Sequence, residues 1–335
     1  MPPVASSVLD AVGNTPIVRL NRVAAGIAAT IAVKVEAISP GRSVKDRIAV
    51  ALVEEAERKG LLKKGGTIVE PTSGNTGVAL ALVAAVKGYR CIFTIPDKMS
   101  AEKIRRLKAF GAEVVVTPTA VPPDSPESYY SVAARIAKET KGAYMPMQYH
   151  NLTNTEAHYK STGPEIWRQT EGKITHFVAG MGTGGTISGT AKYLKEKSKG
   201  KVQVVGVDME GSILEKAFRG KKWTWEETHP YKVEGIGEDF IPKNLLFKFI
   251  DDVVTVGDKE SFLMGRRLAR EEGLFCGGSS GSAVAGALRY AKAKKLGKKA
   301  LVVVLLPDAG EIYLSKMYDD EWMKEQGFLE TGGED

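Results

Sequence analysis

One lysine stands at a position where its positive charge is disfavoured. In SPGRSVKDRIAV, residues 39–50, Ser43 and Asp46 have the spacing of a capping box, and the apolar pattern that follows predicts an amphipathic helix. Lys45 then lies in the first helical turn, where unpaired backbone N–H groups make the helix end positive. The neutral amine is relatively favoured there, and a neutral amine can attack an aldehyde to form a Schiff base.

Three glycine-rich turns could bind what that amine reacts with. They are EPTSGNTG at 70–77, GMGTGGTISG at 180–189 and CGGSSGSAVAGA at 276–287. Each is followed by a predicted helix, whose first N–H groups suit a phosphate or a carboxylate, and hydroxyl and amide side chains add further donors. Each turn alone also fits an ordinary helix cap. The lysine and the turns together indicate pyridoxal phosphate, which needs an amine, a phosphate cup and polar groups around its ring.

Two other enzyme classes share parts of these turns. GMGTGG satisfies G-x-G-x-x-G, and Asp208 ends the next predicted strand, so a nicotinamide oxidoreductase is the alternative from another class. That interpretation gives Lys45 no role. GGSSG contains G-x-S-x-G, but a helical pattern precedes it and no histidine follows Ser279, which excludes a nucleophile elbow.

The elements that must position these turns alternate along the chain. Short β-branched runs predict eight strands, and stretches of helical length with apolar spacing separate most of them, which is typical of an α/β fold with mainly parallel sheets. The runs are IAVKVEA, TIVEP, CIFTIP, EVVVTP, THFVAG, VQVVGVD, DVVTV and LVVVLLP. With 335 residues, 43% of them hydrophobic, the chain is long enough for two lobes.

Composition argues against several partners. The net charge of +7 comes from small clusters at predicted helix ends, so no nucleic-acid partner is expected. The longest apolar run, ALVVVLL, is too short to cross a membrane, and the N-terminus does not resemble a signal peptide, so a cytoplasmic location is expected. Two cysteines in unrelated contexts do not predict a disulfide, and four histidines without ligand spacing do not predict a metal site.

The motifs also resemble those of one known family. SVKDRI, EPTSGNTG, GTGGT, EGIGEDFIP and GGSSGS, in this order between residues 13 and 323, resemble the cysteine synthase and cystathionine β-synthase family of pyridoxal phosphate enzymes. The resemblance implies the two-lobed tryptophan synthase β-like fold, fold type II. It also implies a larger cofactor-binding lobe of residues 1–38 and 151–335, a smaller mobile lobe of residues 39–150, and a homodimer.

The resemblance assigns roles to individual residues. Lys45 is implied to form the Schiff base and to transfer the Cα proton, Asn75 to bind the ring hydroxyl, and Ser279 to donate to the pyridine nitrogen. A neutral serine at that nitrogen favours β-elimination and replacement over transamination. The implied phosphate cup is Gly182, Thr183, Gly184, Gly185 and Thr186. The implied substrate contacts are Thr72, Ser73, Gly74, Thr76, Gln148 and Gly235.

The implied reaction is replacement of a leaving group on Cβ of serine, or of an activated serine, by a thiol or sulfide. VEGIGEDFIP, with Glu234, is closer to the cystathionine β-synthase core, in which homocysteine is the acceptor. STGPEIW at 161–167 is instead similar to cysteine synthases, which combine sulfide with O-acetylserine or O-phosphoserine. Glu234 is either a group that manages a proton near the incoming thiol or a surface carboxylate, and Glu238 stands where the animal enzymes have tyrosine. No haem segment or regulatory module is expected.

Overall fold

The chain folds into two compact units. The computed structural model describes residues 4–72, 74–97, 99, 101–118, 120–122, 125–224 and 227–330. The first unit contains the residues up to Gly13 together with Ser39–Asn154, and the second contains Asn14–Ile38 and the residues from Thr155 onward. The family resemblance implies that all of residues 1–38 belong to the larger lobe. The N-terminal residues belong instead with the first unit, because Leu9 of the short helix η1 (Val8–Ala11) packs against its core.

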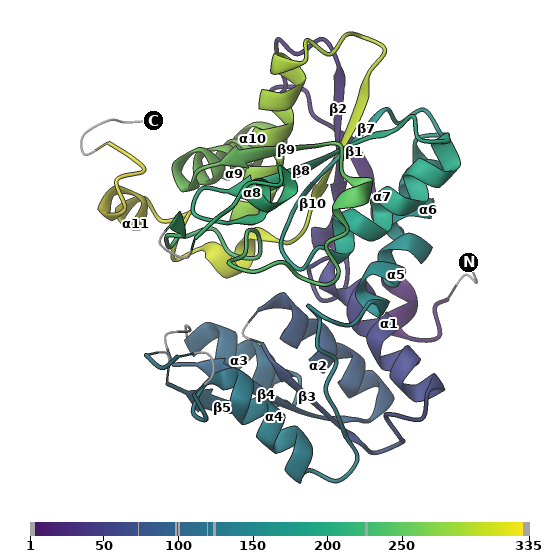
Figure 1. Ribbon diagram of the computed structural model, residues 1–335, viewed down its shortest axis with the longest axis vertical. Coiled ribbons are helices and arrows are strands. Elements are labelled where there is room, and N and C mark those ends of the chain that lie inside the picture. Colours follow the sequence, from purple (N-terminus) through teal and green to yellow (C-terminus); the bar gives the residue numbers. More distant parts are fainter. Residues whose placement is uncertain are drawn as a thin grey trace. The chain divides into compact units, whose positions relative to one another are not determined.

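The first unit is built on a four-stranded sheet in the order β5-β4-β3-β6, in which every neighbouring pair is parallel. Its strands are β3 (Thr67–Pro71), β4 (Arg90–Pro96), β5 (Glu113–Thr117) and β6 (Ala143–Tyr144). Its helices are α1 (Lys45–Arg58), α2 (Asn75–Lys87), α3 (Ala101–Ala109) and α4 (Tyr129–Glu139), labelled in Figure 1. Parallel strands need crossover connections, so the turns after β3 and β4 lie at the same edge of the sheet.

The second unit has a six-stranded sheet in the order β1-β2-β10-β7-β8-β9, in which only the β1–β2 pair is antiparallel. Its strands are β1 (Ile17–Arg19), β2 (Thr30–Val35), β7 (His176–Gly180), β8 (Gln203–Met209), β9 (Asp252–Val256) and β10 (Leu301–Leu306). Its helices are α6 (Thr162–Gln169), α7 (Gly185–Ser198), α8 (Leu214–Phe218), α9 (Asp258–Glu272), α10 (Gly278–Ala293) and α11 (Asp320–Glu325). Helix α5 (Thr153–Lys160) begins at the boundary between the units.

The predicted α/β class is confirmed, and all eight predicted strands form. The two further strands, β1 and β6, are only three and two residues long, which is too short for a β-branched or alternating pattern to stand out. Among the described residues, no helix is both long enough and apolar enough to cross a membrane.

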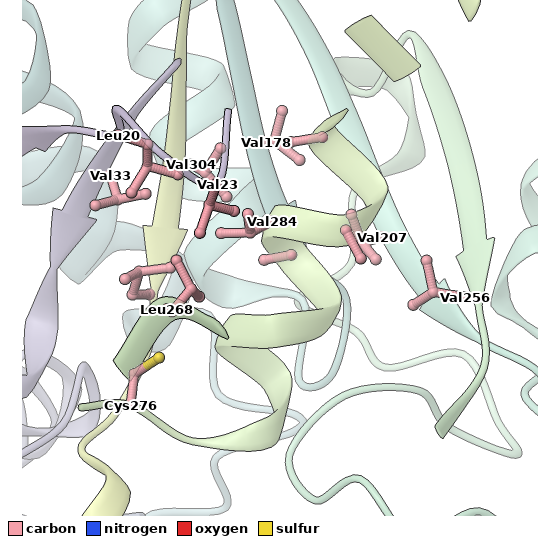
Figure 2. Packing of buried hydrophobic residues seen from close by; sticks show 14 of the residues in the cluster. Leu20, Val23, Val33, Val178, Val207, Val256, Leu268, Cys276, Val284 and Val304 are labelled. Atoms are coloured by element: carbon pink, nitrogen blue, oxygen red, sulfur yellow. The ribbon is translucent and has the colours of Figure 1, made fainter. Parts of the chain in front are cut away.

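The core of the second unit explains why the sequences of its strands are continuous apolar runs. Val33 of β2 pairs with Val304 of β10, and both side chains are fully buried. Figure 2 shows them in one cluster with Val178 and Val207 of the neighbouring strands and with Val284 of α10. Strands in a parallel sheet are covered on both faces, so neither face needs polar residues. A rigid sheet of this kind fixes the turns at its edge.

A buried lysine interrupts the apolar pattern of β2. The Nζ atom of Lys34 donates to Glu165 Oε2 at 2.7 Å, to Gln169 Oε1 at 2.9 Å and to the carbonyl of Thr15 at 2.6 Å. The Lys34 side chain is 0% exposed and that of Glu165 is 8% exposed. The ion pair therefore lies out of water, where the loss of one partner leaves the other charge uncompensated.

We expect Lys34→Met to lower the free energy of unfolding by about 3–5 kcal/mol, because the buried Glu165 carboxylate loses the Lys34 ammonium that pairs with it. The matched control is Lys160→Met, which removes a pair with Glu156 whose side chains are 69% and 50% exposed. That loss is expected to cost less than about 0.5 kcal/mol. Denaturant unfolding of both variants provides the measurement, and equal losses would contradict a structural role for the buried pair.

Candidate functional site

Lys45 is the first residue of α1, so its predicted place in the first helical turn is confirmed. The predicted capping box is wrong. The Ser43 hydroxyl accepts the Lys45 amide at 3.3 Å, and the Asp46 carboxylate accepts the Gly41 amide at 2.6 Å, while Val44 occupies the N-cap without a side-chain hydrogen bond. The Asp46 carboxylate contacts the loop before the helix closely enough to occupy the place of a side chain at Gly41. The acidic neighbour of Lys45 therefore serves to fix the loop that leads into α1.

The start of α2 assembles part of the predicted substrate site. The Thr76 hydroxyl donates to Gln148 Oε1 at 2.7 Å, and both side chains are buried. These residues are far apart in the chain, so the fold has brought two of the predicted substrate contacts together within the first unit. Thr72 is also buried, and its hydroxyl lies 3.5 Å from the Gly74 amide.

Helix α2 begins without a side-chain cap. Asn75 is the first residue of the helix, and its N-cap, Gly74, has no side chain to cap it. Uncapped N–H groups at a helix start suit a carboxylate. Ser73, the remaining predicted contact of this turn, lies outside the described residues.

The predicted phosphate cup opens α7 in the second unit. Helix α7 begins at Gly185, and its N-cap, Gly184, is left-handed with φ 84°. A Cβ atom at Gly184 would lie 2.5 Å from the backbone of Leu245, and one at Gly182 would lie 2.7 Å from the carbonyl oxygen of Gly235. Only glycine fits both places, and the turn presents backbone N–H groups at a helix start. This geometry suits a phosphate group.

A buried histidine, to which the sequence assigned no role, contacts a hydroxyl of the predicted phosphate cup. His158 of α5 is buried, with Nε2 3.1 Å from the Thr186 hydroxyl and Nδ1 2.8 Å from the Thr162 hydroxyl. The imidazole therefore links a hydroxyl of the predicted cup to helix α6. In the sequence, the signal for this contact is the four-residue spacing of His158 and Thr162 in HYKST, which can bring the two side chains together.

The EGIG loop and the start of α10 lie beside the cup. The Gly237 amide donates to the carbonyl of Met181 at 2.6 Å, which holds the loop against the turn before α7. Val233, at the other end of the loop, lies 3.5 Å from the place of a Cβ atom at Gly278. Ser279, the next residue, is buried in the first turn of α10. Within the second unit, the predicted ring-nitrogen donor and the predicted phosphate cup therefore share one neighbouring loop.

Glu234 forms an ion pair in this loop. The Lys316 Nζ atom donates to Glu234 Oε1 at 2.8 Å, and the two side chains are 42% and 34% exposed, respectively. Glu238 lies further along, and its backbone amide donates to the Ser212 hydroxyl at 3.0 Å. The partial exposure of Glu234 is compatible with either role that the sequence left open.

Asp208 does not have the role that a nicotinamide site would require. It is fully buried, and its Oδ2 atom accepts the Glu215 amide at 2.7 Å at the start of α8. Burial raises the pKa of this carboxyl to about 6. The acidic residue that would bind a ribose is therefore committed to fixing a helix.

Residues 8–308 match a family of proteins described as pyridoxal-phosphate dependent enzymes. The chain belongs to this family. It is 48% identical over 330 residues to a cystathionine β-synthase of Rattus norvegicus, covering 98% of this chain and 58% of that protein. It is also 48% identical over 327 residues to a cystathionine β-synthase of Saccharomyces cerevisiae, covering 95% of this chain and 64% of that protein. The chain thus spans about three fifths of the length of these relatives.

A solved structure shows that the fold of this chain is shared with a known enzyme. The crystal structure of a hydrogen sulfide-producing enzyme from Fusobacterium nucleatum superposes with a TM-score of 0.84 at 36% identity, covering 94% of this chain and 99% of that one. The predicted fold type II, tryptophan synthase β-like architecture is confirmed, as are the predicted cofactor and the assignment as an enzyme. The nicotinamide alternative is wrong.

The residues of this chain fit that cofactor. Glycines 182 and 184 let the turn pack against the backbone of Gly235 and Leu245, and α7 starts without a side-chain cap, which suits a phosphate. The hydroxyl of Ser279 is a neutral donor suited to a ring nitrogen. When bound, pyridoxal phosphate supplies an electron-withdrawing ring that stabilises negative charge at the Cα atom of an amino acid. Lys45 would hold the cofactor through its amine and then carry the Cα proton, while the start of α2 would hold the substrate carboxylate.

Proposed function

We propose that this protein catalyses β-replacement on serine or an activated serine by a thiol, with homocysteine as the favoured acceptor and cystathionine as the product. The observation that carries the proposal is the identity of 46–48%, over nearly the whole chain, to proteins named cystathionine β-synthase. The buried Gln148 carboxamide, held by Thr76 of α2, supports it, because an amino-acid donor brings a carboxylate that accepts from an NH₂ group and from a helix start.

The residues of the site divide the work in this proposal. Thr72, Thr76 and Gln148 bind and orient the donor's carboxylate together with the first N–H groups of α2. Lys45 takes the proton from Cα and returns it after the acceptor has added. The neutral Ser279 leaves the ring nitrogen without a carboxylate partner, which limits the negative charge that the ring accepts and favours loss of the Cβ substituent.

A second candidate is cysteine synthesis from sulfide and O-acetylserine or O-phosphoserine. The structural relative from Fusobacterium nucleatum is described as producing hydrogen sulfide, which favours sulfide chemistry on this fold. The STGPEIW stretch, which contains most of α6, favours it as well.

The proposal includes a homodimer and a cytoplasmic location. The family resemblance implies the dimer. Cys91 and Cys276 are buried free thiols, which suits a reducing compartment. Sedimentation of the purified protein tests the dimer, and a monomer would contradict it.

A product competition tests the proposed reaction. The cofactor-loaded protein receives serine, O-acetylserine or O-phosphoserine in separate reactions, each with homocysteine and sulfide together, and mass spectrometry identifies the product. We expect mainly cystathionine from serine. Mainly cysteine from an activated serine would establish the second candidate, and no replacement product from any donor would overturn both.

Glu234→Gln tests the role of Glu234 in that reaction. If the carboxylate manages a proton of the incoming thiol, the variant should form cystathionine about tenfold more slowly, because a positioned acid or base contributes at least that much. The spectral response to serine alone should stay within about twofold of the wild type, since Glu234 acts only after the donor has bound.

The matched control is Glu227→Gln, which removes an ion pair with Lys216 of similar exposure in the same unit. It should leave both half-reactions unchanged, namely the spectral response to serine and the formation of cystathionine. Equal losses in the two half-reactions of Glu234→Gln would remove Glu234 from that role.

A further inference from the structure

A buried carboxylate lies behind the proposed donor site of the first unit. Glu70 of β3 is 1% exposed, and its two oxygens accept the backbone amides of Met147 at 2.9 Å and Gln148 at 3.1 Å. Its neighbours in the strand, Ile68 and Val69, are fully buried and apolar. An apolar residue at position 70 would avoid the cost of burying a carboxylate. The acid is therefore explained by the two amides that it holds.

The segment that Glu70 holds has an unusual backbone. Met147 has φ +56°, in the left-handed region that residues other than glycine rarely adopt. Such a conformation persists where surrounding contacts impose it, and it is concentrated at functional sites. The Met147 side chain is 46% exposed, so packing of that side chain does not explain the conformation. The backbone hydrogen bonds of Met147 do: its amide donates to Glu70, and its carbonyl accepts the amides of His150 and Asn151 at 2.9 Å each.

Gln148 is held on both its backbone and its side chain. Its amide donates to Glu70, its carbonyl accepts the Asn154 side-chain amide at 2.9 Å, and its Oε1 atom accepts the Thr76 hydroxyl at 2.7 Å. The contact with Thr76 holds the carboxamide by its oxygen. The Nε2 atom, a donor of the kind that a carboxylate accepts, is thereby oriented.

We propose that Glu70 is a positioning residue for the amino-acid donor. Together with the other backbone bonds of Met147, it fixes the left-handed turn there, and through that turn it places the Gln148 carboxamide beside Thr76 so that the Gln148 NH₂ group can bind the donor's carboxylate. The inference rests on the proposed function, in which Thr76 and Gln148 bind that carboxylate. The desolvation cost supports it: burial raises the pKa of Glu70 to about 7, while the two amide bonds lower it.

The first test is Glu70→Gln in the cofactor-loaded protein. Glutamine has only one acceptor atom at this place, so one of the two backbone amides would face its NH₂ group. We expect the affinity for serine, measured by titrating the visible spectrum, to fall about tenfold, as the loss of one hydrogen bond to a charged group predicts. Cofactor content and the KM for homocysteine should stay within about twofold, because neither involves the turn at Met147.

Glu57→Gln is the matched control. Glu57 is a carboxylate of α1 in the same unit that accepts hydrogen bonds from Lys87 and Tyr89. Its substitution should leave the affinity for serine unchanged. A folded, cofactor-loaded Glu70→Gln with normal affinity for serine would overturn the inference, as would an equal weakening of donor and acceptor.

A second pair of variants tests the turn without changing the buried acid. Met147→Val places a β-branched residue at a positive φ and should weaken serine binding several-fold. Met147→Gly accepts the same φ without strain and should bind serine within about twofold of the wild type. Equal affinities in the two variants would overturn the inference even if Glu70→Gln does not fold. A wild-type protein without a spectral response to serine or O-acetylserine would contradict the proposed function itself.

Discussion

Lys45→Ala should remove the visible absorption band that the wild-type protein shows after loading with pyridoxal phosphate. It should also lower the rate of β-replacement at least about a thousandfold, because the variant loses both the amine that holds the cofactor and the group that moves the Cα proton. The side chain stands at the first residue of α1, after a loop that the Asp46 carboxylate fixes, so alanine should leave the helix intact. Absorption spectra and turnover assays measure both effects.

Lys63→Ala is the control for this change. Lys63 is an exposed lysine of the same unit, so its loss should alter neither the spectrum nor the rate. A Lys45→Ala protein that keeps the band would show that another amine holds the cofactor. The proposed roles of the other site residues would then need to be reassigned.

Gly184→Ala should weaken the binding of pyridoxal phosphate by at least about thirtyfold, or about 2 kcal/mol. The residue is left-handed with φ 84°, and a Cβ atom there would lie 2.5 Å from both the amide nitrogen and the Cα atom of Leu245. The backbone must shift to admit the methyl group, and the shift moves the N–H groups that open α7. Equilibrium titration of the protein without cofactor measures the affinity.

Gly200→Ala separates that effect from backbone strain alone. Gly200 follows α7 with φ 79°, and no atom lies within 4 Å of the place of its Cβ atom. Alanine should therefore lower stability by about 1 kcal/mol without changing the affinity for the cofactor. If Gly184→Ala binds as tightly as Gly200→Ala, the start of α7 is not the phosphate cup.

The sequence predicted most of the fold because the pattern is strong wherever a strand is buried on both faces. LVVVLL and QVVGVDM have this character, and they form β10 and β8. The β1 strand has no such signal, since it pairs at the edge of its sheet and two of its three residues are exposed. The assignment of the N-terminal residues failed for a related reason. The contact that ties them to the core of the first unit is made by Leu9, and a single apolar residue forms no periodic pattern that could be recognised in the sequence.

The candidate site was predictable where one turn contains the chemistry, as around Lys45 and in the glycine turn before α7. Contacts between distant segments were not predictable. His158 meets Thr186 across 28 residues, and Glu70 meets Gln148 across 78. Each of these residues looks ordinary in its own stretch of sequence. The capping box at Ser43 failed because a spacing of three residues does not determine which amide a carboxylate reaches.

The most direct test of the account is to identify the amine that holds the cofactor. Borohydride treatment of the cofactor-loaded protein fixes the cofactor permanently to that amine, and mass spectrometry of the digested protein locates it. We predict that the modification lies on Lys45, in the peptide containing SVKDRI, at about one cofactor per chain. Modification of another lysine, or of many lysines to small extents, would contradict the account.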